Sequence, residues 1–381
     1  MADPPEQSGP VAVYGATGYT GRLVAAELKR RGADFVLAGR NAGKLDALAV
    51  RLGGDVPTAA VALEDGPGLR ELLEPCAAVI ACAGPFTAHG EPVLAAATDA
   101  GTHYVDTTGE QPFIELAFDA YGRRAESAGA IVVSAMGFDY APGDMIAALT
   151  AAGIEKPDEV VVAYSVRGFG MSRGTMRSGL RIMGSGDVEY RDGAWRPASG
   201  SVDRGTFDFP PPVGPQRVIR YPSGEPITVP RHVPTRNVSS LFSAESVLPS
   251  SHLARAAPVL MPAIQLAMRT PLRRAGELVI DRLPEGPDEE ARRAARFMIV
   301  CEVRKGTTRR RGMVTGSDVY GLTAFTTAHG ALLAASPGYE RSGALAPSQA
   351  FDPGAFLTAL AEYGVDHEAD PLPEPVQARE G

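Results

Sequence analysis

Three glycines, spaced three residues apart, follow a short apolar segment near the beginning of the chain. The segment Val11 to Tyr14 predicts a buried strand; Gly15, Gly18 and Gly21 come directly after it, and a helical pattern covers residues 23–31. In a strand–glycine turn–helix unit, backbone N–H groups at the beginning of the helix can face a pyrophosphate. The spacing G-x-x-G-x-x-G, a variant of the usual fingerprint, therefore predicts a dinucleotide-binding turn.

Each glycine of this turn has an expected task. Gly15 permits the tight turn, Gly18 lets a phosphate approach closely, and Gly21 lets the helix pack closely on the strand. The alternative, a purely structural turn, is less favoured by the flanking strand and helix. The predicted cofactor-binding residues of the turn are Gly15, Thr17, Gly18, Tyr19, Thr20 and Gly21.

Strands and helices alternate through the first part of the chain. Strands are predicted over residues 11–14, 35–38, 56–61, 78–82, 103–106 and 130–134, with helical patterns between them, for example over 43–52, 66–74 and 90–100. This alternation predicts an α/β fold with an N-terminal Rossmann-like, doubly wound parallel sheet. The loops at the carboxyl ends of its strands should converge on one ligand-binding crevice.

The regular alternation of strand and helix patterns ends after Asp144. The sequence beyond it predicts a second, α+β substrate domain on a mixed sheet. A strand over 159–166, a helix over 175–183 and a hairpin turn at Asp192-Gly193 are expected, as is a second hairpin from 295–306 and 309–319. An apolar stretch broken by prolines covers 253–283. The predicted domains are 9–143 for NADP binding, 144–320 for substrate, and 321–368 for C-terminal helices that pack back on the first domain, with flexible tails at 1–8 and 369–381.

The composition excludes several classes of protein. A net charge of -8 argues against a nucleic-acid binder, which needs a basic surface. The 3 cysteines fit no metal or redox spacing, and no metal site is predicted. The first ten residues are polar, and no apolar run is long enough to cross a membrane. We therefore expect a cytoplasmic protein without a transmembrane segment.

The end of the second strand indicates which dinucleotide is bound. Asp34 stands at the beginning of that strand, on the wrong edge to hold a ribose 2′-OH. Arg40 follows the strand's end, with Asn41 and Lys44 close behind. A guanidinium there suits a 2′-phosphate, so we predict NADPH as the cofactor, bound in part by Arg40, Asn41 and Lys44.

Two other enzyme classes were weighed against this interpretation. Short-chain dehydrogenases use a Tyr with a Lys four residues later, and none of the 11 tyrosines has that neighbour. A serine hydrolase is suggested by GMSRG at 170–174, which matches G-x-S-x-G around Ser172. That alternative would leave the first domain unexplained, and nothing marks His232, His252 or His329 as its base.

Several longer motifs extend over nearly the whole chain: VYGATGYTGRLVAAEL, LAGRN, CAGPFTAHGEPVLAAATDAGTHYVDTTGE, GFDYAPGD, SRGTMRSGL, VTGSDVYGLTA and GALAPSQAF. Together they resemble the saccharopine dehydrogenase-like oxidoreductases, in particular the trans-acting enoyl reductase branch. Val319 and Ala346 depart from the family pattern, which has Pro and Thr there. The resemblance implies a substrate domain inserted after GFDYAPGD and NADPH-dependent reduction of a double bond, or of an imine in true saccharopine reductases.

The crevice also supplies candidates for nicotinamide binding and for catalysis. Ala83, Gly84, Pro85 and Phe86 are expected to lie over the cofactor. Tyr140 is the preferred proton donor, with Asp139 beside it and His89 or water as alternatives. Asp106 is expected to hold Thr107, Thr108 or a substrate group, and Asp144 to cap a helix. Thr175 and Ser178 should face the crevice from the second domain.

The sequence thus favours an NADPH-dependent reductase of a C=C bond, an enone or enoyl group, in a lipid- or polyketide-derived substrate. The expected partner is a small apolar molecule, free or bound to a carrier or lipid. The alternatives are an imine or carbonyl reductase, and a non-catalytic NADP-binding module associated with lipid through residues 253–283. Weak peripheral membrane contact and a homodimer remain open.

Overall fold

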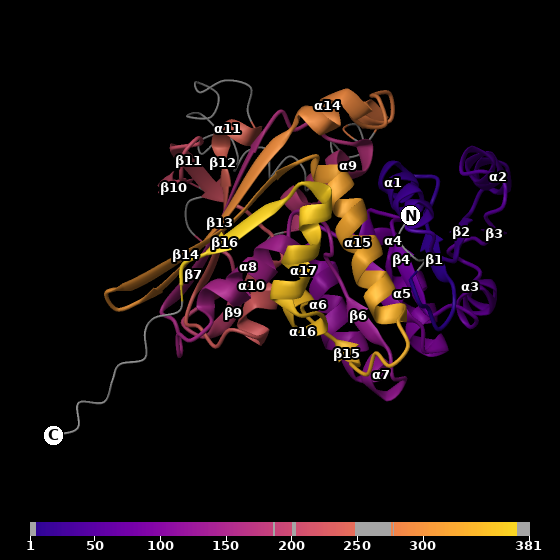
Figure 1. The fold of residues 1–381 in the computed structure, drawn as a ribbon, viewed down its shortest axis with the longest axis horizontal. Coiled ribbons are helices and arrows are strands. Elements are labelled where there is room, and N and C mark those ends of the chain that lie inside the picture. The colour runs from indigo at the N-terminus through magenta and orange to yellow at the C-terminus, as the bar shows by residue number, and fades with distance from the viewer. Residues whose placement is uncertain (1–4, 186, 200–202, 248–275, 277, 372–381) are drawn as a thin grey trace.

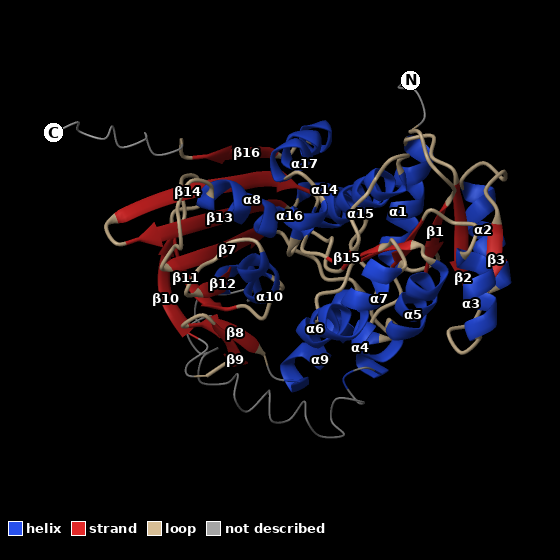
Figure 2. Cartoon of the chain, turned by 90° about the horizontal axis from the view of Figure 1, so that it is seen from below, coloured by secondary structure: helices blue, strands red, loops and turns tan. Residues whose placement is uncertain are grey.

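Two sheets, one from each part of the chain, flank a central layer of helices in the computed structural model (Figure 1). The structure describes residues 5–185, 187–199, 203–247, 276 and 278–371. The first sheet has the order β15-β6-β5-β4-β1-β2-β3 and the second has β10-β11-β12-β7-β13-β14-β16, with β8 beside β12 and β9 beside β8. Seen from below, the second sheet and the first lie at opposite ends of the molecule (Figure 2).

The first sheet confirms the predicted Rossmann-like fold. Its strands are β1 (Val11–Tyr14), β2 (Phe35–Gly39), β3 (Thr58–Ala60), β4 (Ala78–Ala81), β5 (His103–Asp106), β6 (Ile131–Val133) and β15 (Gly343–Ala344). All neighbouring pairs are parallel. The strand order reverses between β1 and β4, and such a switch point is where α/β sheets bind ligands. β1 is buried throughout, as its VAVY sequence predicts for a central parallel strand.

Helices cover both faces of this sheet. They are α1 (Tyr19–Arg30), α2 (Ala42–Arg51), α3 (Gly66–Leu73), α4 (Phe86–His89), α5 (Glu91–Ala100), α6 (Gln111–Leu116), a π-helical turn (Ala117–Tyr121) and α7 (Gly122–Ser127). The core on one face includes Val24 and Leu28 of α1, and the core on the other includes Leu69 of α3 and Leu94 of α5. The sheet is therefore buried on both faces. Its strand ends, with the loops that follow them, are left to bind a ligand.

The second sheet is mixed, as predicted. Its strands are β7 (Glu159–Arg167), β8 (Val188–Arg191), β9 (Ala194–Pro197), β10 (Asp203–Asp208), β11 (Pro215–Arg220), β12 (Val238–Ser243), β13 (Arg296–Lys305), β14 (Thr308–Ser317) and β16 (Asp366–Ala369). β12 is parallel to β7, while β13 and β14 form the expected antiparallel hairpin. Asp192 and Gly193 join β8 to β9 with φ of 52° and 76°, the left-handed geometry that an Asp-Gly hairpin turn favours.

The second part of the chain adds further helices, of which α8 and α15 lie between the two sheets (Figure 1). These helices are α8 (Ala141–Ala151), α9 (Arg173–Ser185), α10 (Glu225–Thr228), a 3₁₀ turn (Val229–Arg231), α11 (Ala244–Val247), α14 (Glu289–Ala294), α15 (Val319–Ala335), α16 (Pro347–Ala350), α17 (Pro353–Ala359) and a 3₁₀ turn (Leu360–Tyr363). α8 packs against β13 and β14, and α15 packs against α1, β4 and β5. One apolar core consequently runs from the first sheet to the inner face of the second.

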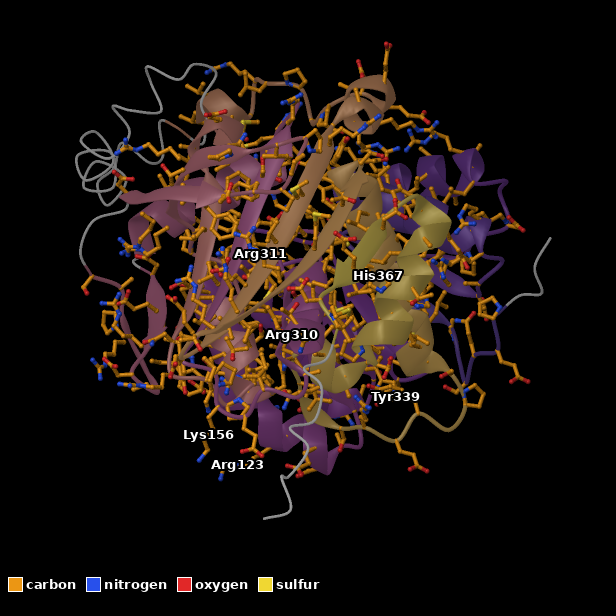
Figure 3. The ribbon with its side chains drawn as sticks, turned by 60° about the vertical axis from the view of Figure 1, so that its left-hand side comes forward. Arg123, Lys156, Arg310, Arg311, Tyr339 and His367 are labelled. Carbon is orange, nitrogen blue, oxygen red and sulfur yellow. The ribbon has the colours of Figure 1, made fainter. Side chains whose placement is uncertain are left out.

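The end of the chain contributes to both sheets. β15 pairs with β6 at the edge of the first sheet, and β16 pairs with β14 at the edge of the second. Buried Arg310 of β14 donates to the carbonyl oxygens of Ala152, at 2.6 Å, and Asp370, at 2.5 Å. Figure 3 labels this arginine together with Arg311 and with His367 of β16. Arg310 thereby ties the end of β16 to the end of α8.

Asp144 is not the N-cap of α8, the helix in which it lies, contrary to the sequence prediction. α8 begins at Ala141, so Asp144 lies in its first turn and is fully buried. Its Oδ1 lies 2.8 Å from Nε2 of His232, and its Oδ2 accepts from the backbone N–H of Ser348 at 2.9 Å. Asp144 is therefore part of an ion pair that joins α8, the turn after α10 and α16. Most of the apolar stretch 253–283 lies outside the described residues.

Candidate active site

The glycine-rich turn has the geometry of a phosphate cradle. Gly15 has φ of +81°, and its N–H donates to the carbonyl of Ala38 at 2.9 Å. The N–H of Gly18 donates to the carbonyl of Gly15 at 3.0 Å, and α1 begins one residue later at Tyr19. The N–H groups of the first turn of α1 have no partners within the helix, which is the donor set that binds a pyrophosphate.

The three glycines differ in the space around them. A Cβ at Gly21 would lie 2.3 Å from the carbonyl oxygen of Gly15, and a Cβ at Gly15 would lie 2.9 Å from the backbone nitrogen of Ala83. At Gly18, which is exposed, a Cβ would meet only the oxygen of Gly15, at 3.3 Å. Gly15 and Gly21 are thus needed for backbone packing, while Gly18 leaves open space in front of the helix.

The residues that follow β2 are exposed at the same edge of the sheet. Arg40, Asn41 and Lys44 all have exposed side chains. Asn41 caps α2, since its Oδ1 accepts from the N–H of Lys44 at 2.9 Å. The N–H of Asp34, at the other end of the strand, is bonded to the side chain of Gln7 at 2.8 Å. The side chain of Asn41 therefore serves as a helix cap. Arg40 and Lys44 are the two side chains at this strand end that are available to bind a phosphate.

The turn after β4 is organised by a glutamate that the sequence analysis did not single out. Buried Glu110 accepts from the N–H groups of Phe86, at 2.8 Å, and Thr87, at 3.0 Å. The ring of Phe86 packs against Phe113 at 5.5 Å, inside the first domain, whereas Gly84 is exposed. Ser178 of α9 donates to Glu110 at 2.8 Å, so this carboxylate also joins the two domains.

A second buried carboxylate fixes the carboxyl ends of β5 and β6. Asp106 accepts from the N–H groups of Thr108, at 2.8 Å, and Ala135, at 2.9 Å, and from the hydroxyl of Ser134 at 2.8 Å. Burial raises the pKa of Asp106 to about 6 despite these bonds. The predicted contact with Thr108 is present, and the role of Asp106 is to hold two neighbouring loops in place.

Asp139 and Tyr140 lie where the loop after β6 meets the second domain. The hydroxyl of Tyr221 donates to Oδ2 of Asp139 at 3.1 Å, and the rings of Tyr140 and Tyr221 are stacked at 6.4 Å. Burial raises the pKa of Asp139 to about 6. Tyr140 is buried, donates to the carbonyl of Gly109 at 3.0 Å, and has its pKa raised well above the usual value by burial.

A further acid lies behind this pair. Glu225 is fully buried; it accepts a short hydrogen bond from the hydroxyl of Tyr164 and a 3.2 Å bond from Ser240. Burial raises the pKa of Glu225 to about 7. The ring of Tyr164 lies edge-on to Tyr221 at 5.8 Å. The wall of the second domain here consists of aromatic rings with acids and hydroxyls at their edges.

Ser172 serves as a helix cap rather than as a nucleophile. Its Oγ accepts from the N–H of Thr175 at 3.2 Å, while Thr175 contacts the hydroxyl of Tyr320 at 3.0 Å. His232 is paired with Asp144, and Nδ1 of His329 faces Arg31. Neither histidine is a base for Ser172, and His252 lies outside the described residues, so the geometry does not support the hydrolase alternative.

His89 is the remaining catalytic candidate. It is exposed at the end of α4, next to Gly90, and no side chain caps the following helix.

Within the described part of the chain, no group of three or more His, Cys, Asp or Glu side chains could hold a metal ion.

Glu110, Tyr221, Glu225 and Tyr320 were all missed by sequence reasoning. Glu110 stands in the TTGE segment directly after β5, and its place at a strand end could have marked it as a crevice residue. The other three come from the second domain, whose sheet order carries no comparable rule. Only the fold brings Tyr221 to Asp139, Glu225 to Tyr164 and Tyr320 to Thr175.

Comparisons with known proteins agree with this geometry. Residues 11–133 match the family model of the saccharopine dehydrogenase NADP binding domain. A Mycobacterium tuberculosis protein provisionally named a trans-acting enoyl reductase is 36% identical over 220 residues, covering 54% of this chain and 51% of that protein. A Mycobacterium bovis protein named trans-acting enoyl reductase is 35% identical over 147 residues, covering 37% of this chain and 35% of that protein. The chain spans about half the length, or less, of these curated relatives.

A solved structure shows the same fold over nearly the whole chain. The apo, histidine-tagged saccharopine dehydrogenase (L-Glu forming) from Saccharomyces cerevisiae matches with a TM-score of 0.58 at 13% identity, covering 96% of this chain and 100% of that chain. The parallel sheet, its glycine-rich turn and the mixed sheet define a two-domain, dinucleotide-binding protein. Residues 11–133 match the NADP-binding domain of saccharopine dehydrogenases, and the chain resembles a saccharopine dehydrogenase in fold.

No helix among the residues that the structure describes is long and apolar enough to cross a membrane.

Proposed function

We propose that the protein is an NADPH-dependent reductase of a C=C bond in an enone or enoyl group, carried by an apolar, lipid- or polyketide-derived substrate. The observation that carries the proposal is the aromatic, acid-bearing wall around Asp139, which faces the carboxyl ends of β5 and β6 from the second domain. Two relatives that bear the name trans-acting enoyl reductase support the choice of bond.

The residues at the nucleotide end fit NADPH. The open space before α1 suits a pyrophosphate, because a Cβ at Gly18 would meet only the carbonyl oxygen of Gly15. The exposed cations Arg40 and Lys44 at the end of β2 suit a 2′-phosphate. NADPH, when bound, supplies the hydride, and the protein supplies orientation and exclusion of water.

The proton for the second carbon comes, in this proposal, from Asp139. A carboxyl group with a pKa of about 6 is in part protonated near neutral pH and can release its proton. Tyr140, in contrast, already donates to Gly109, and its raised pKa makes it a weaker acid. We assign Tyr140 to holding the Gly109 turn, directly before Glu110, and Tyr221 to orienting Asp139.

The substrate should be largely apolar and should carry one polarisable carbonyl group. Phe138, Tyr164 and Phe242 pack around this region, while Tyr221 presents both a ring and a hydroxyl. Hydrogen bonds aimed at the carbonyl oxygen would stabilise the negative charge that develops there. A carrier- or lipid-bound form of the substrate, a cytoplasmic location and a homodimer stay predictions.

Transfer of deuterium from labelled NADPH tests the proposal. With a panel of enones and enoyl thioesters, deuterium should appear on a carbon that bears neither nitrogen nor oxygen. Deuterium on a carbon that bears an amine or a hydroxyl would identify the alternative imine or carbonyl reductase. Cofactor binding without oxidation by any member of the three substrate classes, together with flotation on liposomes, would identify the non-catalytic alternative.

A further inference from the structure

A short segment of the second domain crosses onto the first turn of α1. This crossing segment, residues 283–287, is held at its base by Arg173: the N–H of Arg173 donates to the carbonyl of Glu285 at 2.9 Å, and its Nε donates to that of Leu283 at 2.6 Å. On the other side, the hydroxyl of Tyr19 donates to the carbonyl of Pro287 at 2.7 Å. The crossing segment therefore connects the beginning of α9 to the nucleotide turn at the beginning of α1. Figure 1 labels both helices.

The contact with the nucleotide turn is close. A Cβ at Gly286 would lie 2.6 Å from the ring of Tyr19, so a glycine is what lets the crossing segment lie flat against that ring. Tyr19 stands directly after Gly18, the glycine expected to lie next to the cofactor phosphate. The crossing segment thus lies beside the phosphate cradle.

Glu285 brings a negative charge to this position. Its Oε2 lies 2.5 Å from Nη2 of Arg22, and Nη1 of Arg22 donates to the carbonyl of Thr17, inside the glycine-rich turn, at 2.8 Å. The hydrogen bond from Arg22, and then the charges of Arg173 and Lys44, hold the pKa of Glu285 below its usual range. A carboxylate from one domain therefore pairs with a cation that itself holds the nucleotide turn of the other.

This ion pair can be exchanged. The side chains of Arg22 and Glu285 are 26% and 54% exposed, and exposed pairs of this kind contribute little stability. A phosphate dianion is a stronger partner for a guanidinium than one carboxylate is. Glu285 would in turn repel a phosphate that approached the same cations.

We propose that Glu285 competes with a phosphate group of the dinucleotide for Arg22, and that Arg22 is a phosphate-binding residue of this chain. The inference rests on the proposed use of NADPH. Cofactor binding then exchanges the carboxylate for the phosphate and releases the crossing segment from α1. Glu285 lowers the affinity for the cofactor and links cofactor binding to the position of the second domain.

Titration of the full-length protein at low salt tests this, without any turnover. The probes are NADPH, NADH, 2′,5′-ADP and 5′-ADP, and the readout is the dissociation constant from calorimetry. We expect E285Q to bind NADPH about threefold to fivefold more tightly than the native protein, the effect of one exposed charge. R22Q should bind it about tenfold more weakly, and E285Q should have little effect in the R22Q background.

A matched control comes from the same stretch of chain. Asp281 forms an ion pair with Arg177 of α9 rather than with α1, so D281N should leave all four dissociation constants unchanged. If E285Q gains affinity for 2′,5′-ADP alone, the competition takes place at the 2′-phosphate. If it gains affinity for 5′-ADP as well, the competition takes place at the pyrophosphate. Both results support the inference.

Other outcomes would overturn it. Equal affinities of native protein and E285Q for every probe, independent effects of E285Q and R22Q, or an equal gain in D281N would each show that Glu285 does not compete, while NADPH binding itself stands. Failure of all variants to bind NADPH would instead overturn the proposed cofactor and this inference together.

Discussion

Gly18 and Gly21 are expected to respond in opposite ways to a larger side chain. In Gly21→Ala the new Cβ would lie 2.3 Å from the oxygen of Gly15 and 2.9 Å from Cα of Ala16, both backbone atoms, so α1 must move away from β1. Overpacking of this kind costs about 1–3 kcal/mol, and the better helix propensity of Ala offsets up to ~1 kcal/mol. We expect a net loss of about 1–2 kcal/mol of stability.

Gly18→Val should leave the fold almost intact. Gly18 has φ of -72°, which any residue can adopt, and a Cβ there meets one atom at 3.3 Å. The side chain would fill the space in front of α1, where the phosphate is expected. The variant should therefore have nearly the same unfolding midpoint as the native protein, but it should no longer bind NADPH.

Thermal unfolding with and without NADPH distinguishes the two effects. Gly21→Ala should lower the midpoint of the unbound protein by a few degrees, about 2–4 °C per kcal/mol for a domain of intermediate size. Gly18→Val should keep that midpoint and lose the shift that NADPH causes. Native-like binding by Gly18→Val would refute the phosphate assignment, and a native midpoint for Gly21→Ala would refute the packing argument.

Three further changes test the site and its support. Arg40→Ala should remove most of a preference for NADPH over NADH that we expect to be at least about tenfold, or ~1.4 kcal/mol; equal affinities in the native protein would show that Arg40 has no such role. Asp139→Asn should lower kcat about a hundredfold with NADPH affinity unchanged, whereas Tyr140→Phe should cost about tenfold or less; the reverse order would restore Tyr140 as the donor. The native rate should also fall as the pH rises above about 6, because only protonated Asp139 can donate, and a rate independent of pH would exclude it. His232→Leu should destabilise the fold by about 3–5 kcal/mol, because it leaves buried Asp144 unpaired. Burial opposes both charges, yet the pair lowers the pKa of Asp144 and raises that of His232. The Asp144 contribution is lost as the pH falls below about 3.9, and that of His232 is lost as the pH rises from about 6.5 through its raised pKa; a loss independent of pH, measured by urea unfolding, would contradict the pairing.

The first domain could be predicted closely because its strands are local patterns bounded by glycine turns. VAVY, FVLAG and AVIA became β1, β2 and β4 within a residue or two, and the crevice rule then located the turn at Gly15 and the loop at Asp139. Neither result required knowledge of long-range contacts.

The parts that could not be predicted depend on contacts between distant segments. Asp144 looked like a cap because it is acidic near the beginning of a helix, but its partners, His232 and Ser348, are 88 and 204 residues away. Tyr221 reaches Asp139 through the order of strands in the mixed sheet, which no periodicity reveals. Arg22 was not singled out from the sequence, since nothing in the sequence brings Glu285 to it.

The order in which the chain is synthesised bears on the first sheet. β1 to β6 leave the ribosome long before α15 and β15, yet Phe325 and Ala328 of α15 belong to the same core as Val24 of α1 and Ile80 of β4. Until residue 335 has emerged, the part of that face which α15 covers, against α1, β4 and β5, is exposed apolar surface. The nucleotide turn therefore acquires its final support only after α15 has been synthesised, and a stop codon before residue 319 would remove the packing beneath α1 without touching the glycines.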